Sequence, residues 1–154
     1  GRIALKVYRL VDREVVDALY RAAQRGVAID LVVSGACVLR PGVPGLSDRI
    51  RVVAPVGRHF ESSRVFAFGA PDSSSVFLSS GDFALAHLDR QIDVAVPVED
   101  PAHRARLEAT LDILLRLPAW EMDADGSWHR RGPGAEDALR RLSYTNRMPE
   151  RQAR

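Results

Sequence analysis

The first 33 residues constrain the fold most, because they contain two apolar stretches separated by one amphipathic segment. Residues 3–9 and 27–33 have the apolar composition of buried strands. Between them, Asp12 is a suitable helix N-cap, apolar positions recur at helical spacing from Val15 onward, and Gly26 ends the pattern. Strand, helix and strand within about 30 residues form a βαβ unit. We therefore predict two parallel neighbouring strands joined by a right-handed crossover.

More strands and one long helix follow this unit. Four further stretches have strand-like composition and are bounded by turn residues, namely 49–55, 64–69, 75–80 and 91–98. Asp100 and Pro101 then begin a helix, since they supply an N-cap and a first-turn proline. A hairpin at 119–131 follows, with Asp125 and Gly126 at its turn. The pattern predicts an α/β domain in which helices flank a mixed β-sheet.

Length and composition are those of one domain with a polar extension. The chain has 154 residues, of which 46% are hydrophobic, enough to bury a sizeable core. After residue 131 it becomes polar and rich in arginine. We predict a domain over 1–131 and a partly disordered tail over 132–154, with a short helix near 135–142. Because a strand pattern starts directly after Gly1, we expect a domain cut from a longer polypeptide.

The charge is weakly positive, but the basic residues are of one kind. The formal net charge is +2, too small to indicate a nucleic-acid partner. Lys6 is the only lysine among 22 basic residues, and the rest are arginine. A guanidinium group binds phosphate oxygens two at a time, so the bias is compatible with phosphate binding. GC-rich coding also increases the arginine content, and composition does not separate the two explanations.

Cysteine content and hydropathy set the expected compartment. Cys37 is the only cysteine and lies in an apolar run, so we expect a buried structural thiol and no internal disulfide. The sequence has no apolar run of about 18 residues and no leading signal peptide. We expect a cytoplasmic location and no membrane span. The four histidines are scattered, so no metal site is predicted.

Several stretches that carry no general fold signal point to one family. LRPGVPGLS, PVEDP and DGSW occur with the other motifs in an order and spacing that resemble the C-terminal domain of bacterial polyphosphate kinases, over residues 3–131. The resemblance implies a phospholipase D-like architecture. It also implies reversible transfer of phosphate between ATP and polyphosphate through a phosphohistidine with Mg²⁺. ATP and Mg²⁺ are implied by this resemblance alone, and no cofactor is predicted for the chain itself. The implied partners are an upstream catalytic domain or other subunits, and polyphosphate.

The same resemblance implies that the site is incomplete. In the family, the stretch corresponding to residues 57–64 has a histidine directly before the serine and arginine that match Ser63 and Arg64, and here that position is Ser62. Ser34 stands where the family has an arginine that contacts nucleotide phosphates. Other polar or aromatic family positions are also changed, at Phe83, Ala86, His87 and Gln91. The resemblance therefore implies that no intact set of catalytic residues remains.

Six side chains stay as candidates for binding phosphate: Arg58, Ser63, Arg64, Ser80, Asp82 and Arg90. The two arginines near position 61 bind phosphate or pair with Glu61 and solvent. Asp82 orients a neighbour or caps the next turn. His59 is three residues from position 62, which places it on the other face of an extended chain, so we do not expect it to replace the missing imidazole.

Two functions follow from this reading. The chain is the C-terminal domain of a polyphosphate kinase-type phosphotransferase that is inactive in isolation, or it is a degenerate domain that binds phosphate polymers or mediates subunit contacts. A phosphodiesterase of the phospholipase D type requires a His-x-Lys pair, which the sequence lacks.

Overall fold

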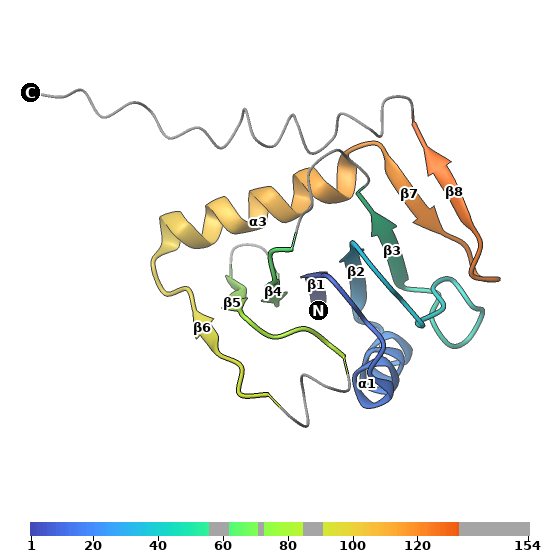
Figure 1. The fold of residues 1–154 in the computed structure, drawn as a ribbon, viewed down its shortest axis with the longest axis horizontal. Helices are drawn as coiled ribbons and strands as arrows, with labels where there is room; N and C mark the ends of the chain where they lie inside the picture. The colour runs from blue at the N-terminus through green and yellow to red at the C-terminus, as the bar shows by residue number, and fades with distance from the viewer. Residues whose placement is uncertain (56–61, 71–72, 85–90, 133–154) are drawn as a thin grey trace, which may run out of the picture.

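The computed structural model describes residues 1–55, 62–70, 73–84 and 91–132. In this part of the chain, one mixed sheet lies between two helices (Figure 1). The strands are β1 (Arg2–Val7), β2 (Ala28–Val33), β3 (Ile50–Ala54), β4 (Val65–Phe68), β5 (Ser75–Ser79), β6 (Ala95–Pro97), β7 (Ala119–Met122) and β8 (Trp128–Arg131). The helices are α1 (Arg13–Gln24) and α3 (Pro101–Arg116). The strand order is β6-β5-β4-β1-β2-β3-β7-β8.

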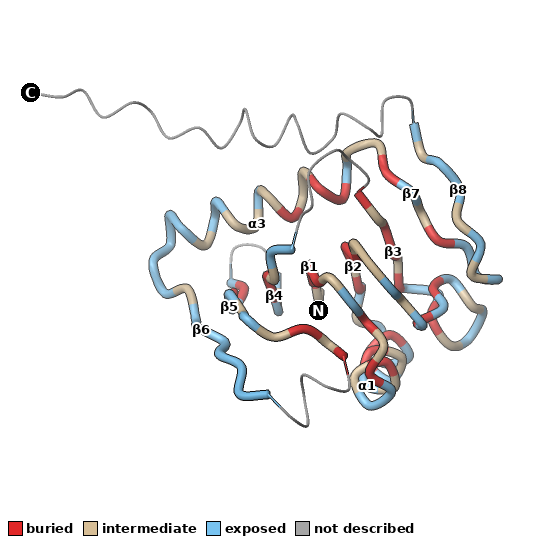
Figure 2. The backbone as a smooth tube through the Cα atoms, in the orientation of Figure 1, coloured by how far each residue is buried: buried red, intermediate tan, exposed pale blue. Residues whose placement is uncertain are grey.

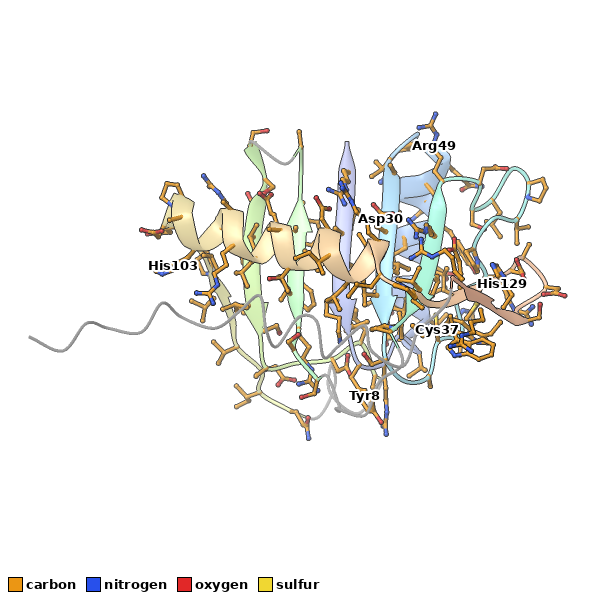
Figure 3. All side chains as sticks on the ribbon, turned by 90° about the horizontal axis from the view of Figure 1, so that it is seen from above. Tyr8, Asp30, Cys37, Arg49, His103 and His129 are labelled. Carbon is orange, nitrogen blue, oxygen red and sulfur yellow. The ribbon has the colours of Figure 1, made fainter. Side chains whose placement is uncertain are left out.

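The centre of the sheet is parallel, as the βαβ pattern predicts. β1 pairs with β2 in parallel from Arg2↔Ala28 to Val7↔Val33, and β2 pairs with β3 in parallel. All other pairs are antiparallel. The carboxyl ends of β1, β2, β3 and β5 and the amino end of β4 therefore meet at one edge, which we call the carboxyl edge. Tyr8, which follows β1, marks this edge in Figure 3.

Each helix covers one face of the sheet. Asp12 caps α1 by accepting a hydrogen bond from the Val15 amide at 2.9 Å, and α1 buries Val16 and Leu19 against the sheet. Asp100 caps α3 in the same way through the His103 amide, also at 2.9 Å. These caps confirm both helix starts expected from the sequence.

The helix α3 packs on the opposite face. Its buried side chains are Leu111, Leu114 and Leu115. Leu111 contacts a cluster on β1, β4 and β5, and the other two contact β2 and β3. Figure 2 shows buried residues concentrated in the central strands, whereas β6 and much of α3 are exposed. The polar residues of the carboxyl edge are thus attached to the most buried strands of the sheet.

One predicted strand is longer than the strand in the structure. The stretch 91–98 was expected to be extended throughout, but β6 spans only Ala95–Pro97. Pairing stops because its neighbour β5 ends at Ser79, and the Val94 amide donates to the Ser80 hydroxyl. The predicted helix near 135–142 and the tail lie outside the described residues.

A search of the described residues for a helix with the length and apolar character of a membrane span found none.

Candidate functional site

A fully buried lysine joins three segments at the carboxyl edge. The Lys6 ammonium, near the end of β1, donates to the Ser34 hydroxyl at 2.9 Å. It also donates to the carbonyl oxygens of Val7 and Ser63, at 3.5 Å each. The serine that follows β2 and the segment that precedes β4 are therefore held to the same cation. A buried amine needs such partners because leaving water is costly for a charged group.

Lys6 was not among the residues predicted for the site, although the sequence carries a signal for it. Lys6 lies between the buried Leu5 and Val7, in a strand whose neighbour on the same face is the buried Ala4. A lysine in a buried strand is rare unless its ammonium is paired. The isolated lysine in IALKVY is therefore a site signal that a search of polar loops overlooks.

Arg64 lies next to this lysine in the network and has an unused donor. One terminal nitrogen, Nη1, donates to the carbonyl oxygen of Ser62 at 3.1 Å, and Nη2 lies 3.9 Å from an Asp82 carboxylate oxygen. The Nε–H is buried and meets no acceptor among the described residues. Buried donors in proteins are nearly always satisfied, so this one favours an acceptor that comes from a ligand. Glu61, the alternative partner, lies outside the described residues.

Asp82 connects Arg64 to the end of β1. Its nearly buried carboxylate accepts hydrogen bonds from the Tyr8 amide at 3.1 Å and the Arg9 amide at 2.7 Å. The next carbonyl, of Phe83, accepts from the amides of residues 11 and 12. Of the two roles considered for Asp82, these contacts are those of a residue that orients its neighbours.

Ser80 is used differently. Its hydroxyl donates to Asp93 at 2.8 Å and accepts from the Val94 amide at 3.0 Å, so it fixes the chain after β5. A hollow of about 320 Å³ lies beside it, lined by Phe66, Ser79, Gly81, Asp82, Phe83, Gln91 and Asp93. The two phenylalanine rings stack with centroids 5.0 Å apart. This hollow borders the carboxyl edge on the face that α1 covers.

The remaining candidates cannot be placed in this group. Arg58, Arg90 and His59 lie outside the described residues. The two described histidines lie away from the carboxyl edge, His103 at the start of α3 and His129 in the β7–β8 hairpin (Figure 3). His129 is 2.8 Å from an Asp123 carboxylate oxygen.

Cys37 has the character of a structural thiol. It is partly buried and packs against the core on the α1 face. Burial raises the pKa of Cys37 from 9.0 to about 11, so the thiolate is scarce near neutral pH.

The described residues do not form a metal site of their own. No group of three or more histidine, cysteine, aspartate or glutamate side chains is arranged among them to hold an ion. Asp82 is occupied by two amides and Arg64.

A second cluster of charged residues closes the carboxyl end of α3. Arg51 donates to Glu121 at 3.0 Å and to the Leu115 carbonyl at 2.8 Å. Arg131 donates to the carbonyls of Leu115 and Leu117, at 2.6 and 2.9 Å, and pairs with Glu121 at 3.3 Å. These arginines satisfy the last carbonyl groups of the helix, which have no partner within it.

Comparisons with known proteins identify the family of this chain. The profile of the family described as polyphosphate kinase C-terminal domain 2 matches residues 1–141. A polyphosphate kinase from Rhodopirellula baltica is 46% identical over 147 residues, which cover 94% of this chain and 17% of the relative. A polyphosphate kinase from Streptomyces coelicolor is 47% identical over 138 residues, which cover 88% of this chain and 18% of the relative. The chain thus spans about a fifth of the length of these relatives.

Solved structures extend the comparison to the fold. The polyphosphate kinase of Porphyromonas gingivalis has a TM-score of 0.84 at 35% identity, over 94% of this chain and 24% of that one. NucT from Helicobacter pylori has a TM-score of 0.56 at 13% identity, over 74% of this chain and 78% of that one, and supports the fold alone. The architecture is the expected phospholipase D-like α/β fold. From its sequence and its fold, the chain belongs to the polyphosphate kinase C-terminal domain family.

Proposed function

We propose that this chain serves as the C-terminal domain of a polyphosphate kinase-type phosphotransferase, acting reversibly on ATP and polyphosphate, and that it transfers no phosphate in isolation. The observation that carries the proposal is the buried Nε–H of Arg64, which meets no acceptor among the described residues, beside the buried ammonium of Lys6. Family membership gives the chemical class of the ligand that would supply the acceptor.

The two cations have the chemistry that a phosphate chain requires. Phosphoryl transfer depends on fixed positive charge around the phosphate oxygens and on a nucleophile in line with the phosphorus. Lys6 and Arg64 are held at the carboxyl edge by the carbonyls of residues 62 and 63 and by Asp82. They stabilise charge, but neither is a phosphate acceptor. In our proposal, Ser62 and Ser34 replace the histidine and arginine of the active family members, so the chain retains binding without transfer.

A second candidate is a degenerate domain that binds phosphate polymers without serving any catalytic partner. The same unsatisfied Nε–H supports it, because an anion bound there needs no nucleophile. The two candidates differ in what happens when the rest of a kinase is supplied. Only the first predicts phosphate transfer in that assembly.

Activity is tested by incubating the chain with labelled ATP, Mg²⁺ and polyphosphate. We expect no transfer of label, because a serine hydroxyl without a neighbouring base is a poor phosphate acceptor. Turnover that disappears in Ser62→Ala or in His59→Ala would overturn the proposed inactivity and identify the accepting side chain.

Binding is tested by retention of the chain on immobilised polyphosphate at increasing salt. We expect retention at low salt that falls as salt rises, because counterions compete for the polyanion. Arg58→Ala combined with Arg64→Ala should weaken it. The matched control is Arg13→Ala combined with Arg21→Ala, which removes the same charge from the exposed face of α1. Equal losses in both variants would show that the effect comes from net charge alone. No retention at low salt would remove the second candidate, the domain that binds phosphate polymers.

A further inference from the structure

A row of apolar side chains is exposed where β5 and β6 reach the carboxyl edge. Leu78 and Val96 are register partners, so they lie on the same face of the sheet, and they are 43% and 53% exposed. Val94, two residues before Val96, is 57% exposed, and Ile92 is 100% exposed. These are four of the seven large apolar side chains that the described residues expose. Such a concentration marks an interaction surface more often than single exposed residues do.

The row is exposed because it extends beyond α3. Leu78 is paired with Val65, which packs with Leu111 of α3, so the row lies on the α3 face. The helix crosses in front of the strands near the middle of their length, so the strand ends marked by Tyr8 lie beyond it (Figure 3). All three residues of β6 are exposed, as Figure 2 shows in pale blue. We call three of these residues the β6 row, namely Leu78 of β5, Val96 of β6 and Val94, which directly precedes β6.

The segment that carries Val94 and Val96 is acidic. Residues 91–100 contain Asp93, Glu99 and Asp100 and no lysine or arginine. A second copy would bring the same carboxylates to the contact, and like charges at close range are destabilising. An arginine or lysine rim on the partner would instead be complementary.

The free edge of β6 is also unsuited to pairing with a second copy. The Ser80 amide donates to the Val94 carbonyl and the Val98 amide donates to the Val76 carbonyl, so residues 94 and 98 are bonded toward β5. Pro97 occupies the alternate position, which faces outward, and has no N–H to donate. Proline at such a position is a common device against edge-to-edge association. The side chains of the β6 row, and not the strand edge, therefore form the contact surface.

We propose that the β6 row docks against another domain of a longer polyphosphate kinase chain, a domain that presents apolar side chains surrounded by arginine or lysine. Relatives of this family carry about four-fifths of their length outside the part that this chain matches. The Porphyromonas gingivalis kinase embeds the same fold in a chain of which it makes up 24%. The inference rests on family membership and surface chemistry, and it holds whether or not the site transfers phosphate.

Hydroxyl-radical footprinting tests this by measuring how fast each side chain is oxidised by solvent radicals. The isolated chain is compared with a chimera in which it replaces the matched segment of the Porphyromonas gingivalis kinase. We expect oxidation of Val94 and Val96 to be at least about threefold slower in the chimera, because docked side chains exclude water. Val38 is the internal control and should not change. It is 56% exposed and follows β2, which is separated from β6 by β5, β4 and β1 in the strand order.

Two variants and one further measurement make the result decisive. Val94→Asp in the chimera should restore fast oxidation of Val96, whereas Val38→Asp, a substitution at matched exposure, should not. If the chimera fails to fold, the same oxidation rates are measured in the unaltered Porphyromonas gingivalis kinase, on the strand that aligns with β6. Equal oxidation in the isolated and embedded forms would overturn the proposal. Protection of the isolated chain that grows with its concentration would also overturn it, because the occupant would then be a second copy.

Discussion

Two clusters of partly buried arginines and their carboxylate partners are built from the same kinds of side chain and differ in how completely their hydrogen-bond donors are satisfied. At the end of α3, Arg51 and Arg131 share Glu121 and donate to the carbonyls of Leu115 and Leu117. At the carboxyl edge, Arg64 has one carbonyl partner, one carboxylate at 3.9 Å and a buried Nε–H without an acceptor among the described residues.

The difference separates a structural arginine from an arginine that is available to a ligand. A guanidinium whose buried donors are all used by the protein stabilises the fold and keeps no buried donor for an anion. A guanidinium that keeps a buried donor unused has a cost in the free protein that a phosphate oxygen can offset. Between the arginines, Arg131 of the first cluster should therefore affect unfolding more, and Arg64 of the second should affect binding more.

The largest loss of stability is expected from removing the Asp82 carboxylate at the carboxyl edge. Asp82→Ala leaves two amides and Arg64 without their acceptor in a nearly buried position. We expect the free energy of unfolding to fall by about 3–5 kcal/mol, because each of the two amides left without an acceptor costs about 1–3 kcal/mol. Urea denaturation measures it, with Asp82→Asn as the control that keeps one acceptor oxygen. An unchanged midpoint for Asp82→Ala would mean that this carboxylate does not hold the edge together.

The next test exchanges the roles of the two clusters. Arg131→Met leaves the carbonyls of Leu115 and Leu117 short of a donor, so we expect a loss of about 1–3 kcal/mol in unfolding free energy. Its retention on polyphosphate should not change. Arg64→Met should lower the unfolding free energy by less than about 1 kcal/mol, because its ion pair is long and its exposure is partial. Its retention on polyphosphate should weaken.

Both variants are measured by urea denaturation and by polyphosphate retention on the same preparations. A similar loss of the same property in both variants would contradict the difference between the clusters. A loss of unfolding free energy mainly in Arg131→Met and of retention only in Arg64→Met would support it.

The smallest effect concerns Cys37, which reports how closed the core is beside the carboxyl edge. Burial raises the pKa of this thiol from 9.0 to about 11. The folded state thus holds the thiol proton more tightly, and its contribution to stability is complete below pH 9 and is lost between pH 9 and 11. We expect alkylation by iodoacetamide at pH 8 to be slow in the folded chain and fast in urea. Equal rates in both states would show that the thiol is open to solvent.

The sequence predicts the local elements of this fold better than their arrangement. The caps at Asp12 and Asp100 and the crossover between β1 and β2 follow from spacing within a few residues or one helix. The place of β4 beside β1 does not, because it pairs residues about 60 positions apart through contacts that no local pattern encodes. Sheet order is therefore the part that required the structure.

The candidate site shows the same difference between local sequence patterns and contacts that depend on sheet order. Ser63, Arg64 and Asp82 are recognisable as polar residues in family motifs, and the structure brings them to one edge. Lys6 joins them only because an antiparallel strand returns beside β1. The contact between Lys6 and Ser63 depends on the pairing of β1 with β4, so motifs in the loops do not indicate Lys6.

The register between β1 and β4 has a consequence for how such a domain can diverge. Lys6 is opposite Val65, and the apolar pairs that follow from there to Ile3↔Phe68 keep the strands aligned. None of these pairs involves position 62. Substitutions at that position thus leave the alignment of the strands intact, so a domain that changes there would still reach the native topology.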